Sequence, residues 1–278
     1  MDVEGRAANG AAHLPSEWVP VASVEVSSVP PASPTPHLTR LSGVGAHPLG
    51  DLSRFFNPFL THFMRETLRC GGEVWASTEG ADVNGILIFN SVELQASIFT
   101  RNRDVAETLF RWKGQVSVFS EFPLGPAPEV YHIYAIDHPE WNRVHRFAHP
   151  VRAAEPSDRA LVMELVREVY GRVDESWFDR FPPENEACFV VDGADGIAGA
   201  AWAAVVNQHG QLHTLTVRPR YRRTGVGTDL WYARMDWTRS VGAHRVLCEV
   251  ADRNLGSRAI AEAGGMRPVG QIFQSYRS

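Results

Sequence analysis

The sequence predicts an α/β protein in which helices pack on mixed β-sheets. Runs rich in β-branched and aromatic residues alternate with runs of helical period along most of the chain. The stretch from Leu212 to Gly227 begins as an apolar strand, continues as a basic loop with two glycines and then starts a helix. The chain has 278 residues, 44% hydrophobic and 21% charged, which is typical of a globular protein long enough for two domains.

Composition also limits the classes of partner. The net charge of −5 disfavours nucleic acid as the main ligand, because nucleic acids bind to basic faces. The three cysteines, Cys70, Cys188 and Cys248, are far apart and odd in number, which fits a reducing cytoplasm and indicates neither a disulfide framework nor a metal site. No apolar run approaches the roughly 18 residues that cross a bilayer. We therefore expect a cytoplasmic protein without a nucleic-acid, membrane or metal partner.

Two folded units are expected after a disordered N-terminal arm. Residues 1–37 are rich in Ala, Gly, Ser and Pro and offer little to bury. Residues 38–145 form the first unit, and its loop at 100–103 has no glycine where a phosphate-binding turn would need one. In this unit, helices are expected over 49–69 and 103–112, and strands over 74–77, 85–90, 92–99, 115–119 and 130–136.

Residues 146–278 form the second unit, which is reached through a polar connector. The histidines in and beside the connector, His138, His145 and His149, have no recognisable ligand spacing, so surface or capping roles are expected for them. Ser157 is expected to cap the first helix of this unit. Helices are expected over 157–169, 174–181, 228–241 and 255–263, and strands over 151–154, 187–191, 197–206, 212–217, 244–250 and 269–275.

The loop that follows the strand at 212–217 is predicted to bind an anion. Pro219 ends that strand, because proline cannot donate to a sheet ladder. Gly225 and Gly227 let the backbone approach a ligand where a Cβ atom would collide. Free N–H groups at a helix N-terminus favour phosphate. Four arginines add positive charge within six residues, namely Arg218, Arg220, Arg222 and Arg223. The pattern indicates a diphosphate cradle.

Two segments carry a resemblance to the GNAT superfamily of acyltransferases. Residues 222–227, Arg-Arg-Thr-Gly-Val-Gly, resemble the R/Q-x-x-G-x-G/A signature of that family, and Val217-Arg218-Pro219 resembles the V-x-P that leads into it. Residues 246–254 resemble the L-x-L-E-V-x-x-x-N segment. The resemblance implies a GNAT fold for residues 146–278. Because the element order over 38–145 is similar, we expect a degenerate GNAT-like domain there, and so two GNAT-like domains in tandem.

The resemblance also implies the cofactor, which is acetyl-CoA or another acyl-CoA as acyl donor. In the family, the diphosphate lies on the glycine loop and the pantetheine arm runs along the strand before it. Asn254 matches a position near the CoA arm, and its alternative role is to cap the helix that follows. The cofactor-binding positions implied in this sequence are Leu215, Val217, Arg222, Arg223, Thr224, Gly225, Val226, Gly227, Thr228 and Asn254.

Direct transfer of an acyl group to an amine requires a general base, since an ammonium ion is not a nucleophile. Glu249 is the first candidate, because it matches the glutamate of the L-E-V segment, and its alternative role is a solvent-facing or salt-bridged strand residue. His213 is the second candidate, with a structural strand histidine as its alternative. The tyrosine that protonates the thiolate in many relatives is replaced by Ala261. Tyr276, Tyr232 and Ser257 are left open as substitutes.

The sequence therefore predicts an N-acyltransferase that acts on an amine, with a small molecule favoured over a peptide N-terminus or a lysine. A variant takes the acyl group from the pantetheine of a carrier protein. A different class of protein is also left open by Ala261, namely an acyl-CoA sensor or interaction module that catalyses nothing. The identity of the acceptor, the acyl chain and the formation of a homodimer are not predicted by these residues.

Overall fold

The computed structural model describes residues 37–41, 60–69, 71–79, 82–90, 95–112, 117–141, 144–171, 173, 175–178, 181 and 186–276. The expected arm at 1–37 lies outside these residues except for His37, which begins the first strand. The first part of the helix expected over 49–69 also lies outside them, and its remainder is α1. Within the described part of the chain, no helix has the length and apolar character needed to cross a membrane.

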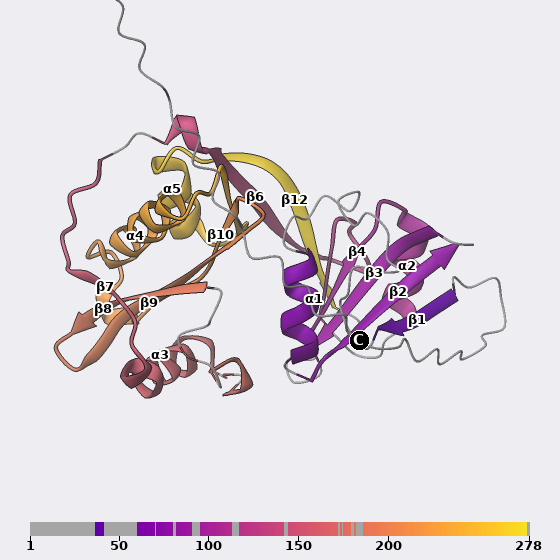
Figure 1. Cartoon of the computed structure of the whole chain (residues 1–278), viewed down its shortest axis with the longest axis horizontal. Coiled ribbons are helices and arrows are strands. Elements are labelled where there is room, and N and C mark those ends of the chain that lie inside the picture. The colour runs from indigo at the N-terminus through magenta and orange to yellow at the C-terminus, as the bar shows by residue number, and fades with distance from the viewer. Residues whose placement is uncertain are drawn as a thin grey trace, which may run out of the picture.

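A single 12-stranded sheet runs through the described residues, with helices on its faces (Figure 1). The helices are α1 (Leu60–Arg69), α2 (Arg103–Trp112), α3 (Arg159–Tyr170), α4 (Val226–Ser240) and α5 (Leu255–Ala263). The strands are β1 (His37–Leu41), β2 (Glu73–Glu79), β3 (Asp82–Asn90), β4 (Gln95–Phe99), β5 (Ser117–Ser120), β6 (Glu129–Asp137), β7 (Val151–Ala153), β8 (Glu186–Gly193), β9 (Gly196–Val206), β10 (His209–Val217), β11 (Arg245–Ala251) and β12 (Arg267–Tyr276).

The sheet order, β1-β2-β3-β4-β5-β12-β6-β11-β10-β9-β8-β7, shows two similar halves. In the N-terminal half, antiparallel strands lead to β4, and α2 then connects β4 to the parallel strand β5. In the C-terminal half, antiparallel strands lead to β10, and α4 connects β10 to the parallel strand β11. Figure 1 shows the two halves on either side of the long strands β6 and β12.

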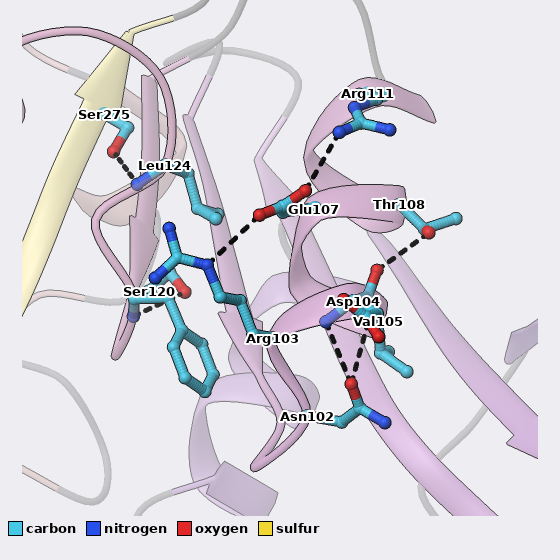
Figure 2. Close-up of polar contacts among 11 residues, drawn as sticks. Asn102, Arg103, Asp104, Val105, Glu107, Thr108, Arg111, Ser120, Leu124 and Ser275 are labelled. Carbon is cyan, nitrogen blue, oxygen red and sulfur yellow. Dashed lines mark hydrogen bonds and ion pairs between the residues drawn. The ribbon is translucent and has the colours of Figure 1, made fainter.

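The two halves exchange strands where they meet. The last strand of the chain, β12, lies between β5 and β6, so it extends the sheet of the N-terminal half. Strand β6 precedes the connector but pairs with β11 over seven residues, from Asp137 opposite Arg245 to Tyr131 opposite Ala251. At the far end of β12, the buried Ser275 hydroxyl accepts a 3.1 Å hydrogen bond from the backbone N–H of Leu124 (Figure 2). Strands β6 and β12 therefore join the two parts of the sheet into one continuous ladder.

Helices cover both faces of the sheet in the C-terminal half. In Figure 1, α4 and α5 lie on one face and α3 lies on the other. Under α4 and α5, an apolar cluster that includes Tyr134, Trp231 and Val246 joins β6, α4 and β11. Close packing there requires a glycine after α5, because a Cβ atom on Gly264 would lie 1.9 Å from the Trp231 ring. This packing fixes α4 against the strands that bound the site described below.

Most of the helices and strands expected in the C-terminal half are confirmed, but the prediction that Ser157 caps the first helix is wrong. A 3₁₀ turn over Pro156–Asp158 precedes α3, and the side chains of Glu155 and Asp158 form the capping box. Asp158 is preferred to Ser157 because its carboxylate also takes two hydrogen bonds from Arg152, at 2.7 and 2.9 Å. The helix expected over 174–181 is, among the described residues, a 3₁₀ turn at Glu175–Phe178.

A fragment cut between residues 145 and 146 tests the strand exchange. Residues 146–278 lack β6, so β11 and β12 would each lose an antiparallel neighbour and expose unpaired backbone groups. We expect this fragment to show no cooperative thermal transition by circular dichroism. Residues 129–278 keep β6 and should recover one. A transition in the shorter fragment as sharp as that of the full chain would contradict the dependence on β6.

Candidate functional site

Two neighbouring parallel strands, β10 and β11, separate in the C-terminal half. They pair from His209 opposite Arg245 to Leu212 opposite Cys248, and no further. Beyond that point β10 continues to Val217 and β11 to Ala251 without pairing with each other. We call the place where the strands separate the fork. The edge of β10 that faces away from β9 therefore has no partner strand over 213–217, and an extended ligand can pair along such an edge.

A β-bulge in β10 lies directly beyond the fork. The pairing of β10 with β9 changes register between His213 and Thr216, and Thr214 adopts a positive φ of 46°. A bulge bends its strand and turns backbone groups out of the ladder. From α3, the Tyr170 hydroxyl lies 3.4 Å from the Thr216 hydroxyl, so a phenol also reaches this segment. Sequence reasoning missed Tyr170, because nothing in the helix sequence indicates contact with a strand more than 40 residues later.

The predicted diphosphate cradle, residues 222–228, lies after the end of β10 and includes the first residues of α4. Gly225 is the residue before α4, has a φ of 101° and offers no side chain to accept hydrogen bonds from the first turn. Arg223 also has a positive φ, of 63°, so the loop turns sharply just before the helix. Gly227 faces β10, since a Cβ atom there would lie 3.8 Å from Val217 and 4.0 Å from Leu215. The loop, the helix N-terminus and the end of β10 therefore lie together, as the sequence predicts.

Two of the four arginines predicted to supply positive charge are engaged elsewhere. The buried Arg218 side chain donates to the Glu164 and Glu168 carboxylates of α3, at 2.8 and 2.6 Å. Arg220 forms an ion pair with Asp195. The positive charge expected from these two arginines is therefore matched by carboxylates, and neither is among the predicted cofactor-binding residues. Arg222 and Arg223 are exposed beside the cradle, and Arg222 donates to the Val217 carbonyl at 3.2 Å.

The connector, residues 144–150, is bound to the first turn of α4 by one buried carboxylate. Asp229 is 1% exposed and accepts hydrogen bonds from His145 Nε2 at 2.6 Å, His149 Nδ1 at 2.8 Å and the His149 amide at 2.9 Å. Burial alone would raise the pKa of Asp229, but these bonds hold it below its ordinary value. Both histidines thus fasten the connector beside Gly225. Among the described residues, no group of three or more His, Cys, Asp or Glu side chains is arranged to hold a metal ion.

Glu249 and His213 are the first residues of β11 and β10 beyond the fork. Cys248 and Val250 pack under α4 and α5, so Glu249 faces the opposite side of the sheet. Solvent reaches Glu249, yet the surrounding protein raises its pKa by desolvation, and His213 opposes this rise. Both observations fit a carboxyl that solvent reaches from one side only. His213 Nε2 lies 3.3 Å from the Glu186 carboxylate. The two candidate bases, Glu249 and His213, therefore lie on neighbouring strands directly beyond the fork.

The remaining predicted residues have structural roles or lie apart from the fork. The Asn254 side chain accepts a 3.1 Å hydrogen bond from the Ser257 amide and so caps α5. Ala261 is buried in the apolar cluster under α4 and α5. Tyr232 stacks on His145 at a centroid distance of 4.1 Å, and Tyr276 is 55% exposed at the end of β12. Neither tyrosine is brought to the fork.

The equivalent place in the N-terminal half is closed. Strands β4 and β5 stay paired from Gln95 opposite Ser117 to Ile98 opposite Ser120, which is the end of β5. The N-terminus of α2 is capped by Asn102, whose side-chain oxygen accepts from the amides of Asp104 and Val105 (Figure 2). Protein groups thus occupy both the ladder and the helix N-terminus that a ligand would need.

Comparisons with known proteins agree with this geometry. Residues 129–265 match the model of the acetyltransferase (GNAT) family. No curated protein matches the sequence of the chain. The fold is similar to a GNAT-family acetyltransferase from Colwellia psychrerythraea, with 10% identity, coverage of 87% of this chain and 99% of that one, and a TM-score of 0.56.

Two further solved structures share the fold. A GCN5-related N-acetyltransferase from Sphaerobacter thermophilus has 16% identity, coverage of 74% of this chain and 80% of that one, and a TM-score of 0.53. A tandem GNAT protein from the clavulanic acid biosynthesis pathway has 13% identity, coverage of 74% and 82%, and a TM-score of 0.52. At these identities the structures establish the fold alone, whereas the family model matches the sequence. The chain therefore carries an acetyltransferase domain of the GNAT family at residues 129–265.

Proposed function

We propose that the chain is an acyl-CoA-dependent N-acyltransferase that passes the acyl group directly to an amine, with a small molecule as acceptor. The observation that carries this proposal is the fork between β10 and β11, beside an uncapped helix N-terminus with two exposed arginines. Acetyl-CoA, or another acyl-CoA, is the donor substrate that supplies an activated thioester. A carrier-protein donor is less favoured, because the chain keeps a loop suited to a nucleotide diphosphate.

The cradle fits a diphosphate on chemical grounds. Amides of a helix N-terminus and of a turn with positive φ bind anions, and the exposed Arg222 and Arg223 add charge. Asp229 in the first turn would oppose an anion, but His145 and His149 partner its carboxylate. Leu215 and Val217 lie on the part of β10 that does not pair with β11, where a pantetheine arm would add to the strand. Thr224, Val226, Gly227 and Thr228 complete the proposed binding set, and Asn254 is proposed at the end of the arm.

Proton transfer is assigned to Glu249. A carboxylate takes the proton of the attacking amine more effectively when its pKa is raised toward neutrality, and desolvation raises that of Glu249. His213 is the second candidate for the base. It also opposes the rise in the pKa of Glu249. Ala261 supplies no acid for the leaving thiolate, but a thiol with a pKa of roughly 8.5, by analogy with cysteine, leaves without one near neutral pH.

We also infer that the N-terminal half is a degenerate GNAT-like domain, so that two such domains stand in tandem over 38–145 and 146–278. The repeated strand–helix–strand order and the parallel pair β4–β5 support this. One observation favours a second function for the chain, acyl-CoA sensing without transfer, namely Ala261 in place of a general acid. Turnover of any amine by the purified protein would exclude it.

Changing Gly225 to Asp should abolish acetyl-CoA binding measured by calorimetry. The substitution places a side chain and a negative charge in the cradle, at a φ of 101° that side chains disfavour. Gly242→Asp is the matched control, because Gly242 also has a positive φ, of 85°, and follows the other end of α4 with open space around it. The control should bind acetyl-CoA like the wild type. Equal affinity in both variants would refute the cradle.

Changing Glu249 to Gln should lower kcat by about 10²–10⁴ without changing the affinity for acetyl-CoA. The wild-type rate should rise with pH through a value above the ordinary carboxyl range, and the variant should lose that dependence. A raised folded-state pKa means that ionisation of Glu249 weakens the fold at neutral pH, so the variant should be at least as stable to heat. Full activity in Glu249→Gln would move the base to His213.

Calorimetry should also give one acetyl-CoA site per chain. The C-terminal half offers the fork and the cradle, whereas β4 and β5 remain paired and Asn102 caps α2. A stoichiometry of two would show that the N-terminal half opens to bind a second donor, against the closed arrangement described above. The Gly225→Asp variant distinguishes the halves, because it should remove the whole signal.

A further inference from the structure

A buried arginine, Arg234, lies beneath the fork. It belongs to α4, is 2% exposed and points its guanidinium between the helix and the sheet. One terminal nitrogen donates to the carbonyl of His213 at 3.1 Å and to that of Trp202 at 3.3 Å. Its Nε donates to the Leu230 carbonyl at 3.3 Å. The side chain thus joins the helix of the cradle to strands β9 and β10.

These contacts lie where the backbone departs from regular pairing. His213 opposite Trp202 is the last pair of β10 and β9 before the bulge. His213 is also the first residue of β10 beyond the fork. The guanidinium influences β11 as well, because burial raises the pKa of the Cys248 thiol to about 12 and the charge of Arg234 opposes this rise. Arg234 is therefore close to both strands at the point where they separate.

The charge of Arg234 has no carboxylate partner among the described residues. Burial lowers its pKa to about 10, so the guanidinium remains protonated at neutral pH. Arg218, the other buried arginine on the same sheet, is matched by Glu164 and Glu168. A buried charge without a counter-ion is costly, and neutral donors would satisfy the same three carbonyls. The positive charge is the part of Arg234 that packing and hydrogen bonding do not require.

We propose that Arg234 is a positioning residue for acyl transfer, which fixes the bulge of β10 and holds an unmatched positive charge behind the acyl oxygen. The inference rests on the function proposed above. In that reaction the amine nitrogen bonds to the acyl carbon, the carbon–sulfur bond breaks with its electrons on sulfur, and the amine proton passes to Glu249. Negative charge grows on the acyl oxygen as the nitrogen–carbon bond forms, and a fixed positive charge stabilises it.

Infrared spectra of bound acetyl-CoA labelled with ¹³C at the carbonyl test this role without an acceptor. A positive field weakens the C=O bond, so the wild type should lower its stretching frequency relative to free acetyl-CoA. Arg234→Met keeps the length of the side chain and loses the charge, and should lose most of this shift. Arg234→Lys keeps the charge with fewer donors and should retain most of it. With an amine acceptor, we expect kcat to fall about 10- to 100-fold in Arg234→Met, with recovery in Arg234→Lys.

Thr238→Val is the matched control on the same helix. Thr238 is buried one turn later and donates to the Met235 carbonyl within α4, so its loss perturbs packing without touching the fork. Stretching frequency and kcat should stay at wild-type values in this variant.

The inference would be overturned if Arg234→Met kept the wild-type carbonyl stretching frequency and the wild-type kcat. It would also be overturned if the loss of kcat were matched by an equal loss of affinity for acetyl-CoA. If Arg234→Met does not fold, a free-solution frequency in Arg234→Lys would overturn it. Failure of the wild type itself to bind acetyl-CoA would instead overturn the proposed function, and the inference with it.

Discussion

The site depends on the separation of two parallel strands that a sheet would otherwise keep paired. Pairing between β10 and β11 stops at Leu212 and Cys248, and each strand loses hydrogen bonds beyond that point. Such a gap persists only if each strand is held from its other side. Strand β10 remains paired with β9 through Thr216 and Val217 after its bulge. Strand β11 remains paired with β6 along its whole length. The fork is therefore a property of four strands.

One of these four strands, β6, is separated in sequence from the other three by the connector. Strand β6 precedes the connector, lies between β11 and β12, and falls within residues 129–265, which match the acetyltransferase (GNAT) family. The connector then returns to the C-terminal half and is fixed to α4 through Asp229. Two attachments, β6 on β11 and the connector on α4, thus hold the segment before β7 against two walls of the site.

Local features of the site could be predicted from the sequence, whereas its distant contacts could not. The glycine loop and the end of β10 before Pro219 follow from neighbouring residues, and Glu249 follows from the resemblance of its segment to the family. Ion pairs of Arg218 with Glu164 and Glu168 cross about 50 residues of sequence, and the contact of His145 with Asp229 crosses 84. The sequence of a strand indicates which of its faces is apolar, but not which other strand lies beside it. The position of β6 beside β11 could therefore not be predicted from its own residues. Arg234 looks like an ordinary surface residue of a helix until the helix is packed on the bulge.

The two unmatched charges near the fork are best understood together. On one face of the sheet, desolvation raises the pKa of Glu249, which means that the folded protein holds its ionised form at a cost. On the other face, burial lowers the pKa of Arg234, which means that the folded protein holds that charge at a cost as well. Burial of Arg234 without a carboxylate partner weakens the fold, and a fold selected for stability alone would pair or replace this arginine. Acyl transfer to an amine requires a group that accepts a proton on the side of the nucleophile and a positive field near the acyl oxygen. Under the proposed function, Glu249 would accept the proton and Arg234 would supply the field, whereas an ion pair between them would do neither.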